Sequence, residues 1–184
     1  TEELRRSLPA GTTIETAGAL ADSADSMGYL MQPLPAMIFI IMTLLMLQLG
    51  SMGKMTLTLL TAPMGLIGVA FAMLVTDSAL GFVAYLGVLA LFGMIIRNSV
   101  ILIDQIKKHE EAGEQPMDAI IDSAVLRFRP IMLTAAAAIL GMLPLMRSIF
   151  WGPMAVAIAG GLIVATVLTL LVLPVMYAAA YRIK

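Results

Sequence analysis

The third apolar stretch of this 184-residue sequence carries a fixed positive charge in its middle. Arg97 and Asn98 lie in the run LALFGMIIRNSVILI, residues 89–103, and the next acidic residue is Asp104. An arginine at the centre of a membrane helix costs about 2.5–3.5 kcal/mol on insertion scales, so an ionisable group there indicates a functional site. Seven residues of helix place Asp104 about 10 Å away. Arg97 therefore either reaches toward water or needs a carboxylate from helices outside this chain.

A second set of polar residues opens the fourth apolar stretch, RFRPIMLT, residues 127–134. Seven residues of helix return to nearly the same face, so Arg127 and Thr134 can line one stripe about 10 Å long. Pro130 disturbs this stripe, because the residue before a proline is biased away from the helix. The alternative is that the arginines anchor the span to anionic headgroups, and we prefer this for Arg129. Three further side chains can relay hydrogen bonds in a dry interior near Arg97: Asn98, Ser99 and Thr166.

The elements that must position these residues are membrane helices. Hydrophobic residues make up 60% of the chain, charged residues only 12%, and the mean hydropathy is +0.98, which is typical of integral membrane proteins. In hydrocarbon every backbone group must be bonded internally, and the apolar segments are too long for barrel strands. The sequence therefore predicts an all-α integral membrane bundle of five transmembrane helices. The predicted spans are Leu34–Leu49, Met55–Val75, Leu80–Ile103, Ile131–Phe150 and Met154–Tyr181.

The predicted connections are short except for the one at 104–130. It begins with a charged, solvated turn that includes His109, and Pro116 then suits the start of an amphipathic helix near 116–129. That helix either lies along the membrane surface or packs on other cytoplasmic loops. Residues 1–32 have a Pro/Gly turn, a β-like run and a lead-in helix, Ala19–Leu30, so they predict the end of a missing soluble domain, with residues 33–184 forming the transmembrane domain.

Basic residues predict the orientation of the bundle. With five spans the termini lie on opposite sides, and a cytoplasmic C-terminus puts seven Lys and Arg residues inside against three outside, as the positive-inside rule requires. The N-terminus and the missing domain are then extracytoplasmic. The inside set is Lys54, Lys107, Lys108, Arg127, Arg129, Arg182 and Lys184, and the outside set is Arg5, Arg6 and Arg147.

Several kinds of chemistry find no support in the sequence. There is no cysteine, no Gly-rich phosphate loop, no HExxH pattern and no Ser/His/Asp set, so we expect neither a hydrolytic enzyme nor a bound cofactor. A net charge of −1 does not suggest a nucleic-acid partner. Sixteen methionines offer soft ligands for metal export, but they are spread as core or lipid-facing residues would be, so we expect no metal site.

Four blocks of the sequence resemble the C-terminal membrane half of a resistance-nodulation-division (RND) efflux pump, with the best match to the hydrophobe/amphiphile multidrug branch. Their order and spacing agree with that family, and the similarity covers essentially the whole chain. The blocks are LTLLTAPMGLIGV (57–69), GFVAYLGVLALFGMIIRNSVILIDQI (81–106), RFRPIMLTAAAAILGMLPL (127–145) and WGPMAVAIAGGLIVATVLTLLVLPVMY (151–177).

The resemblance implies a twelve-span protein of the bacterial inner membrane that works as a homotrimer with a periplasmic adaptor and an outer-membrane channel. Such pumps are proton/drug antiporters rather than enzymes. In them a relay joins paired aspartates of the N-terminal half to a basic residue matching Arg97, with further members matching Thr134 and Arg127, and Asn98 supports it here. Many members have lysine at the position of Arg97, but a guanidinium stays charged, so Arg97 is expected to be a fixed counter-charge.

Two other functions remain open from the sequence. One is a membrane-embedded structural or assembly module of an RND-like protein for secretion or lipid handling. The other is a heavy-metal RND exporter, which would require paired methionines in the porter cleft outside this chain. The resemblance favours proton-driven export of amphiphilic compounds, with antibiotic resistance as the consequence, and places drug contacts in the absent porter domain.

Overall fold

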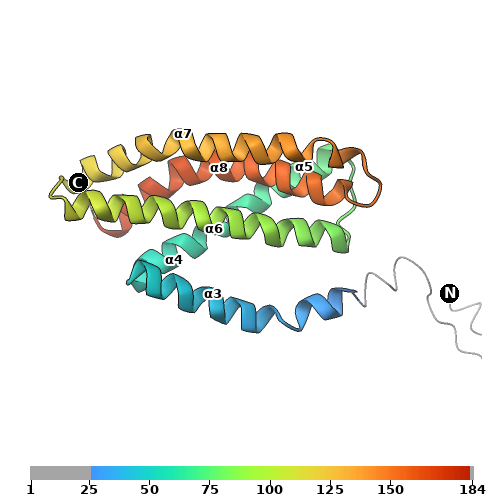
Figure 1. Ribbon diagram of the computed structural model, residues 1–184, viewed down its shortest axis with the longest axis horizontal. Coiled ribbons are helices and arrows are strands. Elements are labelled where there is room, and N and C mark those ends of the chain that lie inside the picture. The colour runs from blue at the N-terminus through green and yellow to red at the C-terminus, as the bar shows by residue number, and fades with distance from the viewer. Residues whose placement is uncertain (1–25, 183–184) are drawn as a thin grey trace, which may run out of the picture.

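The computed structural model describes residues 26–182, and within them the chain is helical with no strand. Five helical segments are long and apolar enough to cross a membrane, which confirms the predicted all-α bundle of five spans. The first span, Ser26–Leu49, ends in α3. The helices of Figure 1 are α3 (Leu34–Leu49), α4 (Met52–Thr61), α5 (Gly65–Val75), α6 (Phe82–Glu111), α7 (Pro116–Met142) and α8 (Gly152–Ala180), with short 3-10 turns η1 (Ala62–Met64) and η2 (Leu145–Arg147).

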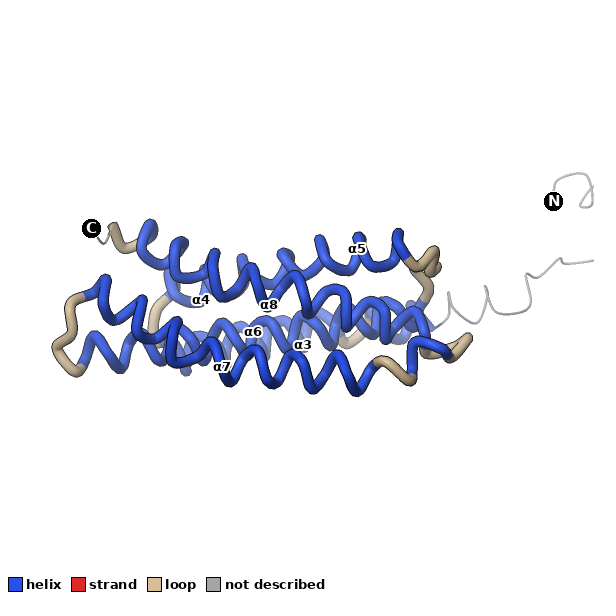
Figure 2. The backbone as a smooth tube through the Cα atoms, turned by 90° about the horizontal axis from the view of Figure 1, so that it is seen from above, coloured by secondary structure: helices blue, strands red, loops and turns tan. Residues whose placement is uncertain are grey.

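The centre of the bundle is α8, which packs against α4, α5, α6 and α7. In the most apolar part of α8, 61% of the residues are buried, whereas the share for the first span is 6%. The helices run along one long axis, with α3 on the outside against α4 and α6 (Figures 1 and 2). The first span therefore leaves most of its apolar surface uncovered in this chain.

The second span is broken in its middle, where η1 separates α4 from α5. Pro63 lies in η1 and has no N–H to continue the helical ladder. Beyond the break, α5 crosses α8 closely, because Gly68 lies against the backbone of Gly160 and Gly161. A side chain at any of these glycines would meet atoms of the facing helix, so the small residues permit this close approach.

The long connection predicted at 104–130 is wrong, because α6 continues to Glu111 and only residues 112–115 form the turn. Two ion pairs support the extension, each between residues one helical turn apart on α6: Lys108–Asp104 at 2.8 Å and Lys107–Glu111 at 3.7 Å. Gly113, with a φ of +90°, allows the sharp reversal into α7. The charged residues taken for a solvated loop are thus the end of a long helix.

A separate helix at 116–129 was also expected, but α7 runs without interruption from Pro116 through Pro130 to Met142. Packing on both sides of the proline accounts for this continuity. Ile120 lies in the same apolar cluster as Ile106 of α6, and Ile131 is buried just after the proline. Membrane helices tolerate an interior proline where neighbouring helices hold the chain in place. The expected surface helix is therefore the beginning of the fourth span.

The turn and β-like run predicted near the N-terminus, and most of the lead-in helix 19–30, lie outside the described residues. Residues 26–30 of that lead-in are helical, as expected.

Candidate functional site

A cavity of about 350 Å³ lies between α6 and α7, and four of the residues singled out from the sequence line it: Arg97, Asn98, Arg127 and Thr134. The short turn at 112–115 makes these helices antiparallel neighbours, which brings the middle of α6 opposite the middle of α7 (Figure 1). The cavity is lined by Met94, Arg97, Asn98, Ile101, Arg127, Pro130, Ile131, Thr134, Ala135, Ala138 and Leu162.

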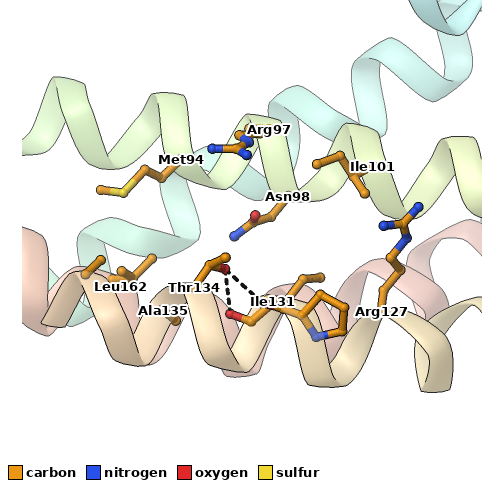
Figure 3. A pocket seen from close by; sticks show the side chains of 11 residues that line it. Met94, Arg97, Asn98, Ile101, Arg127, Ile131, Thr134, Ala135 and Leu162 are labelled. Atoms are coloured by element: carbon orange, nitrogen blue, oxygen red, sulfur yellow. Dashed lines mark hydrogen bonds between the residues drawn. The ribbon is translucent and has the colours of Figure 1, made fainter. Parts of the chain in front are cut away.

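The polar groups enter this cavity from opposite sides. Figure 3 shows Asn98 extending from α6 toward Thr134 on α7, and Arg127 extending from α7 toward α6. The Thr134 hydroxyl lies near two carbonyl oxygens of its own helix, those of Pro130 at 3.1 Å and Ile131 at 2.9 Å. Its lone pairs stay free to accept a hydrogen bond from another group in the cavity. The predicted stripe of Arg127 and Thr134 thus forms despite Pro130.

The two guanidinium groups of the cavity have different surroundings. Arg127 is half-buried and donates from Nη2 to Oε1 of Gln105 at 2.8 Å, whereas Arg97 is exposed on the open side of the cavity. Among residues 26–182, neither arginine lies within 4.0 Å of a carboxylate, since the ion pairs there involve lysines and His109. The cavity therefore gathers two positive charges that no carboxylate of residues 26–182 pairs with.

Within residues 26–182 the Arg97 side chain is exposed, whereas its neighbours on α6, Ile95 and Ser99, are 1% and 0% exposed. The two possibilities raised for Arg97, reach toward water or a carboxylate from outside this chain, therefore both stay open.

Gln105 is a site residue that the sequence analysis missed. It was assigned to the loop after Ile103, so no helical face was considered for it. With α6 extended, Gln105 is seven residues beyond Asn98, which returns it to nearly the same face of the helix. The amide carries no charge, so it holds the Arg127 side chain without pairing it with an anion.

Two other expected relay residues do not enter the cavity. Ser99 lies on the far side of α6 and forms a hydrogen bond with Thr61 at 2.8 Å, and Thr166 donates to the carbonyl of Leu162 at 2.6 Å. Three or more His, Cys, Asp or Glu side chains do not gather anywhere in residues 26–182 in a way that could hold a metal ion. Met94 is the only methionine that lines the cavity.

The described residues thus form a bundle of five helices of membrane-spanning length, with a basic cavity between two of them. The comparison with protein families agrees: the model of the AcrB/AcrD/AcrF family matches residues 1–181. The chain belongs to this family of resistance-nodulation-division transporters, which confirms the relationship inferred from its four sequence blocks.

Several similar proteins are named for metal resistance or metal efflux. The chain is 36% identical over 173 residues to the nickel-cobalt-cadmium resistance protein NccA of Alcaligenes xylosoxydans xylosoxydans, covering 91% of this chain and 16% of NccA. It resembles two crystal forms of a heavy metal efflux pump, with TM-scores of 0.79 and 0.76 at 25% and 26% identity. These matches cover 98% and 97% of this chain and 19% of the pump.

The chain thus spans about a sixth of the length of NccA. The names of these relatives favour the metal-export alternative over the multidrug branch to which the sequence blocks had been compared.

Proposed function

We propose that this chain is the C-terminal transmembrane part of a heavy-metal efflux pump and that its α6–α7 cavity is the basic side of the proton-coupling site. The observation that carries the proposal is the convergence of Arg97, Asn98, Arg127 and Thr134 on one cavity in an otherwise apolar bundle. The similarity to NccA and to a heavy metal efflux pump supports the substrate class.

The cavity can couple proton binding to movement through electrostatics. A guanidinium stays charged at every physiological pH, so Arg97 does not carry the proton itself. A carboxylate from the N-terminal half of the pump, placed near Arg97, would be kept ionised, because an opposite charge lowers the pKa of a carboxyl group. Protonation of that carboxylate removes the attraction, and the two groups then separate.

The neutral polar groups have a different task. Asn98 and Thr134 can hydrogen-bond a carboxylate in either protonation state, since an amide and a hydroxyl both donate and accept. They would hold the acidic group in the cavity while Arg97 responds to its charge. Arg127, held by Gln105, keeps a second positive charge at one end of the cavity.

The same proposal includes the assembly. The intact protein would be a homotrimer of the bacterial inner membrane that meets a periplasmic adaptor and an outer-membrane channel. Within 26–182, four of the basic residues expected on the cytoplasmic side lie toward the bundle end formed by the α6–α7 turn and the end of α8 (Figure 1): Lys54, Lys107, Lys108 and Arg182. Arg127 and Arg129 lie about midway along α7, and Arg147 lies in η2 at the other end. This distribution supports a periplasmic N-terminus and a cytoplasmic C-terminus.

The test uses the full-length pump in cells that lack other metal exporters. We expect Arg97→Ala to abolish tolerance to nickel, cobalt or cadmium salts at normal protein level, and Arg97→Lys to retain part of it because the charge is kept. Arg129→Ala is the matched control, since Arg129 is exposed and does not line the cavity. Wild-type tolerance in Arg97→Ala would refute the coupling role and favour a structural module. If the pump exports amphiphilic drugs but no metal ions, the proposed substrate class is wrong and the coupling role is unaffected.

A further inference from the structure

The helix that carries Arg97 is tied to its neighbours by side-chain hydrogen bonds. Within the described chain, three pairs of residues on different helices are joined in this way, and every pair includes a residue of α6. Ser99 bonds to α4, Gln105 to α7 and Glu110 to α8; the pairs are Ser99–Thr61 at 2.8 Å, Gln105–Arg127 at 2.8 Å and Glu110–Tyr177 at 3.2 Å.

The Ser99–Thr61 pair lies in the dry core of the bundle. Ser99 is 0% exposed and Thr61 is 1% exposed. Thr61 donates its hydroxyl proton to the carbonyl oxygen of Thr58 at 2.7 Å, and a hydroxyl has only one proton to give. Ser99 must therefore be the donor to Oγ1 of Thr61. Ser99 thus donates to a residue of α4 rather than to a carbonyl oxygen of its own helix.

This bond joins the break in the second span to the helix that carries Arg97. Thr61 is the last residue of α4, directly before the η1 break. Ser99 is two residues after Arg97, which places it about 200° around α6 and about 3 Å along the axis. One face of α6 is thus held against the break in the second span while the opposite face presents Arg97 to the cavity.

The bond is sensitive to rotation of α6 about its own axis. Side chains reach a radius of about 5–6 Å from a helix axis, so a rotation of about 30° moves the end of a side chain by roughly 3 Å. The same rotation moves the Ser99 oxygen, closer to the axis, by roughly 2 Å, which ends a hydrogen bond whose normal length is about 2.5–3.0 Å. The Ser99–Thr61 bond can hold only one rotational position of α6.

We propose that Ser99 and Thr61 are positioning residues for Arg97, which set the rotation of α6 and so the place of the guanidinium in the cavity. This inference rests on the proposed proton-coupling function. Breaking the bond leaves an unpartnered hydroxyl in an apolar interior, which is unfavourable, so the pair favours the aligned position of the helix.

The structure offers a matched control on the same helix. Thr58 is 0% exposed and lies one turn before Thr61, but its hydroxyl donates only to the carbonyl of Lys54 in its own helix, at 3.0 Å. Thr58→Val and Thr61→Val remove the same atoms from equally buried positions of α4. Only Thr61→Val removes a bond to α6.

The experiment measures proton-driven metal transport by the full-length pump in proteoliposomes as the imposed pH difference is varied. We expect Thr61→Val and Ser99→Ala each to lower the maximal rate about threefold to tenfold, the factor that the loss of one net hydrogen bond represents, with the metal KM unchanged. The double variant should be no slower than either single one, and Thr58→Val should stay within about twofold of the wild type. Thr61→Ser, which keeps the hydroxyl, should restore the rate.

The failures of the two proposals are distinguishable. Equal rates for Thr61→Val and Thr58→Val, with Arg97→Ala inactive, would overturn the positioning role and leave the coupling site intact. Losses that add in the double variant would also overturn it. An active Arg97→Ala would instead refute the coupling function. If Thr61→Val lowers the amount of assembled pump, the comparison of Ser99→Ala with Thr58→Val decides the question.

Discussion

At the close crossing of α5 and α8 there is room for one methyl group, which either helix can carry but not both at once. A Cβ built at Gly160 would collide with the Cβ of Ala72 on α5 and would lie 3.1 Å from the carbonyl oxygen of Gly68. Ala72 itself is only partly buried and packs at the edge of this crossing. The two positions therefore share space for one methyl group.

The expected magnitudes follow from this geometry. Gly160→Ala overpacks the crossing, at about 1–3 kcal/mol, and regains about 0.5–1 kcal/mol from the lower backbone entropy of alanine in a helix. Ala72→Gly destabilises by about 0.5–1 kcal/mol through the reverse change. In the double variant the collision is absent, so we expect the pair to be more stable than the sum of the single changes by about 1–2 kcal/mol.

The assay is unfolding of the purified full-length pump by SDS in mixed micelles, followed by tryptophan fluorescence, for the wild type and the three variants. A coupling of 1.4 kcal/mol corresponds to about a tenfold difference in the unfolding equilibrium. Additivity within about 0.5 kcal/mol would show that the methyl groups do not compete for space and would refute the packing of α5 on α8 described above.

Two further predictions concern the other bonds of α6. Gln105→Leu should lower metal export by the full-length pump severalfold, because it removes the acceptor of the one hydrogen bond that the Arg127 guanidinium makes within residues 26–182. Gln115→Leu in the exposed α6–α7 turn should leave export unchanged. Equal export by both variants would refute a role for the Gln105 amide. Tyr177→Phe should lower the free energy of unfolding by about 0.5–1.5 kcal/mol through the loss of its bonds to Glu110. Tyr181→Phe, at a residue 43% exposed, should change it by less than about 0.5 kcal/mol, and equal losses in SDS unfolding would contradict the assignment.

The sequence predicted the number and type of the spans because hydrocarbon leaves the backbone little choice. It failed where tertiary packing overrode local signals. The charged run at 104–111 looked like a solvated loop, yet ion pairs along one helix face continue α6. Pro130 looked like a boundary, yet Ile120 and Ile131 pack on either side of it and hold α7 together. The i,i+4 spacing of the ion pairs was available in the sequence, whereas the packing of α7 on α6 is visible only once the helices are placed side by side.

The candidate site, like the fold, could be predicted only in part from the sequence. Arg97 and Asn98 were recognisable because a charge and an amide are out of place in an apolar run, and Arg127 and Thr134 because helical spacing puts them on one stripe. The cavity brings these four together, but their role in proton coupling stays a proposal. Gln105 and Thr61 gave no such signal, since a glutamine near a helix end and a threonine in a span are ordinary residues. Their importance depends on partners 22 and 38 residues away.

The unbroken course of α7 has a mechanical consequence. A helix of 27 residues is about 40 Å long, and this one is unbroken between its start at Pro116 and the site at Thr134. Its one weak point there is Pro130, which has no N–H for the helical ladder. A partner that displaces the α6–α7 turn would thus act on Thr134 along the backbone of α7, with bending at Pro130 taking up part of the displacement.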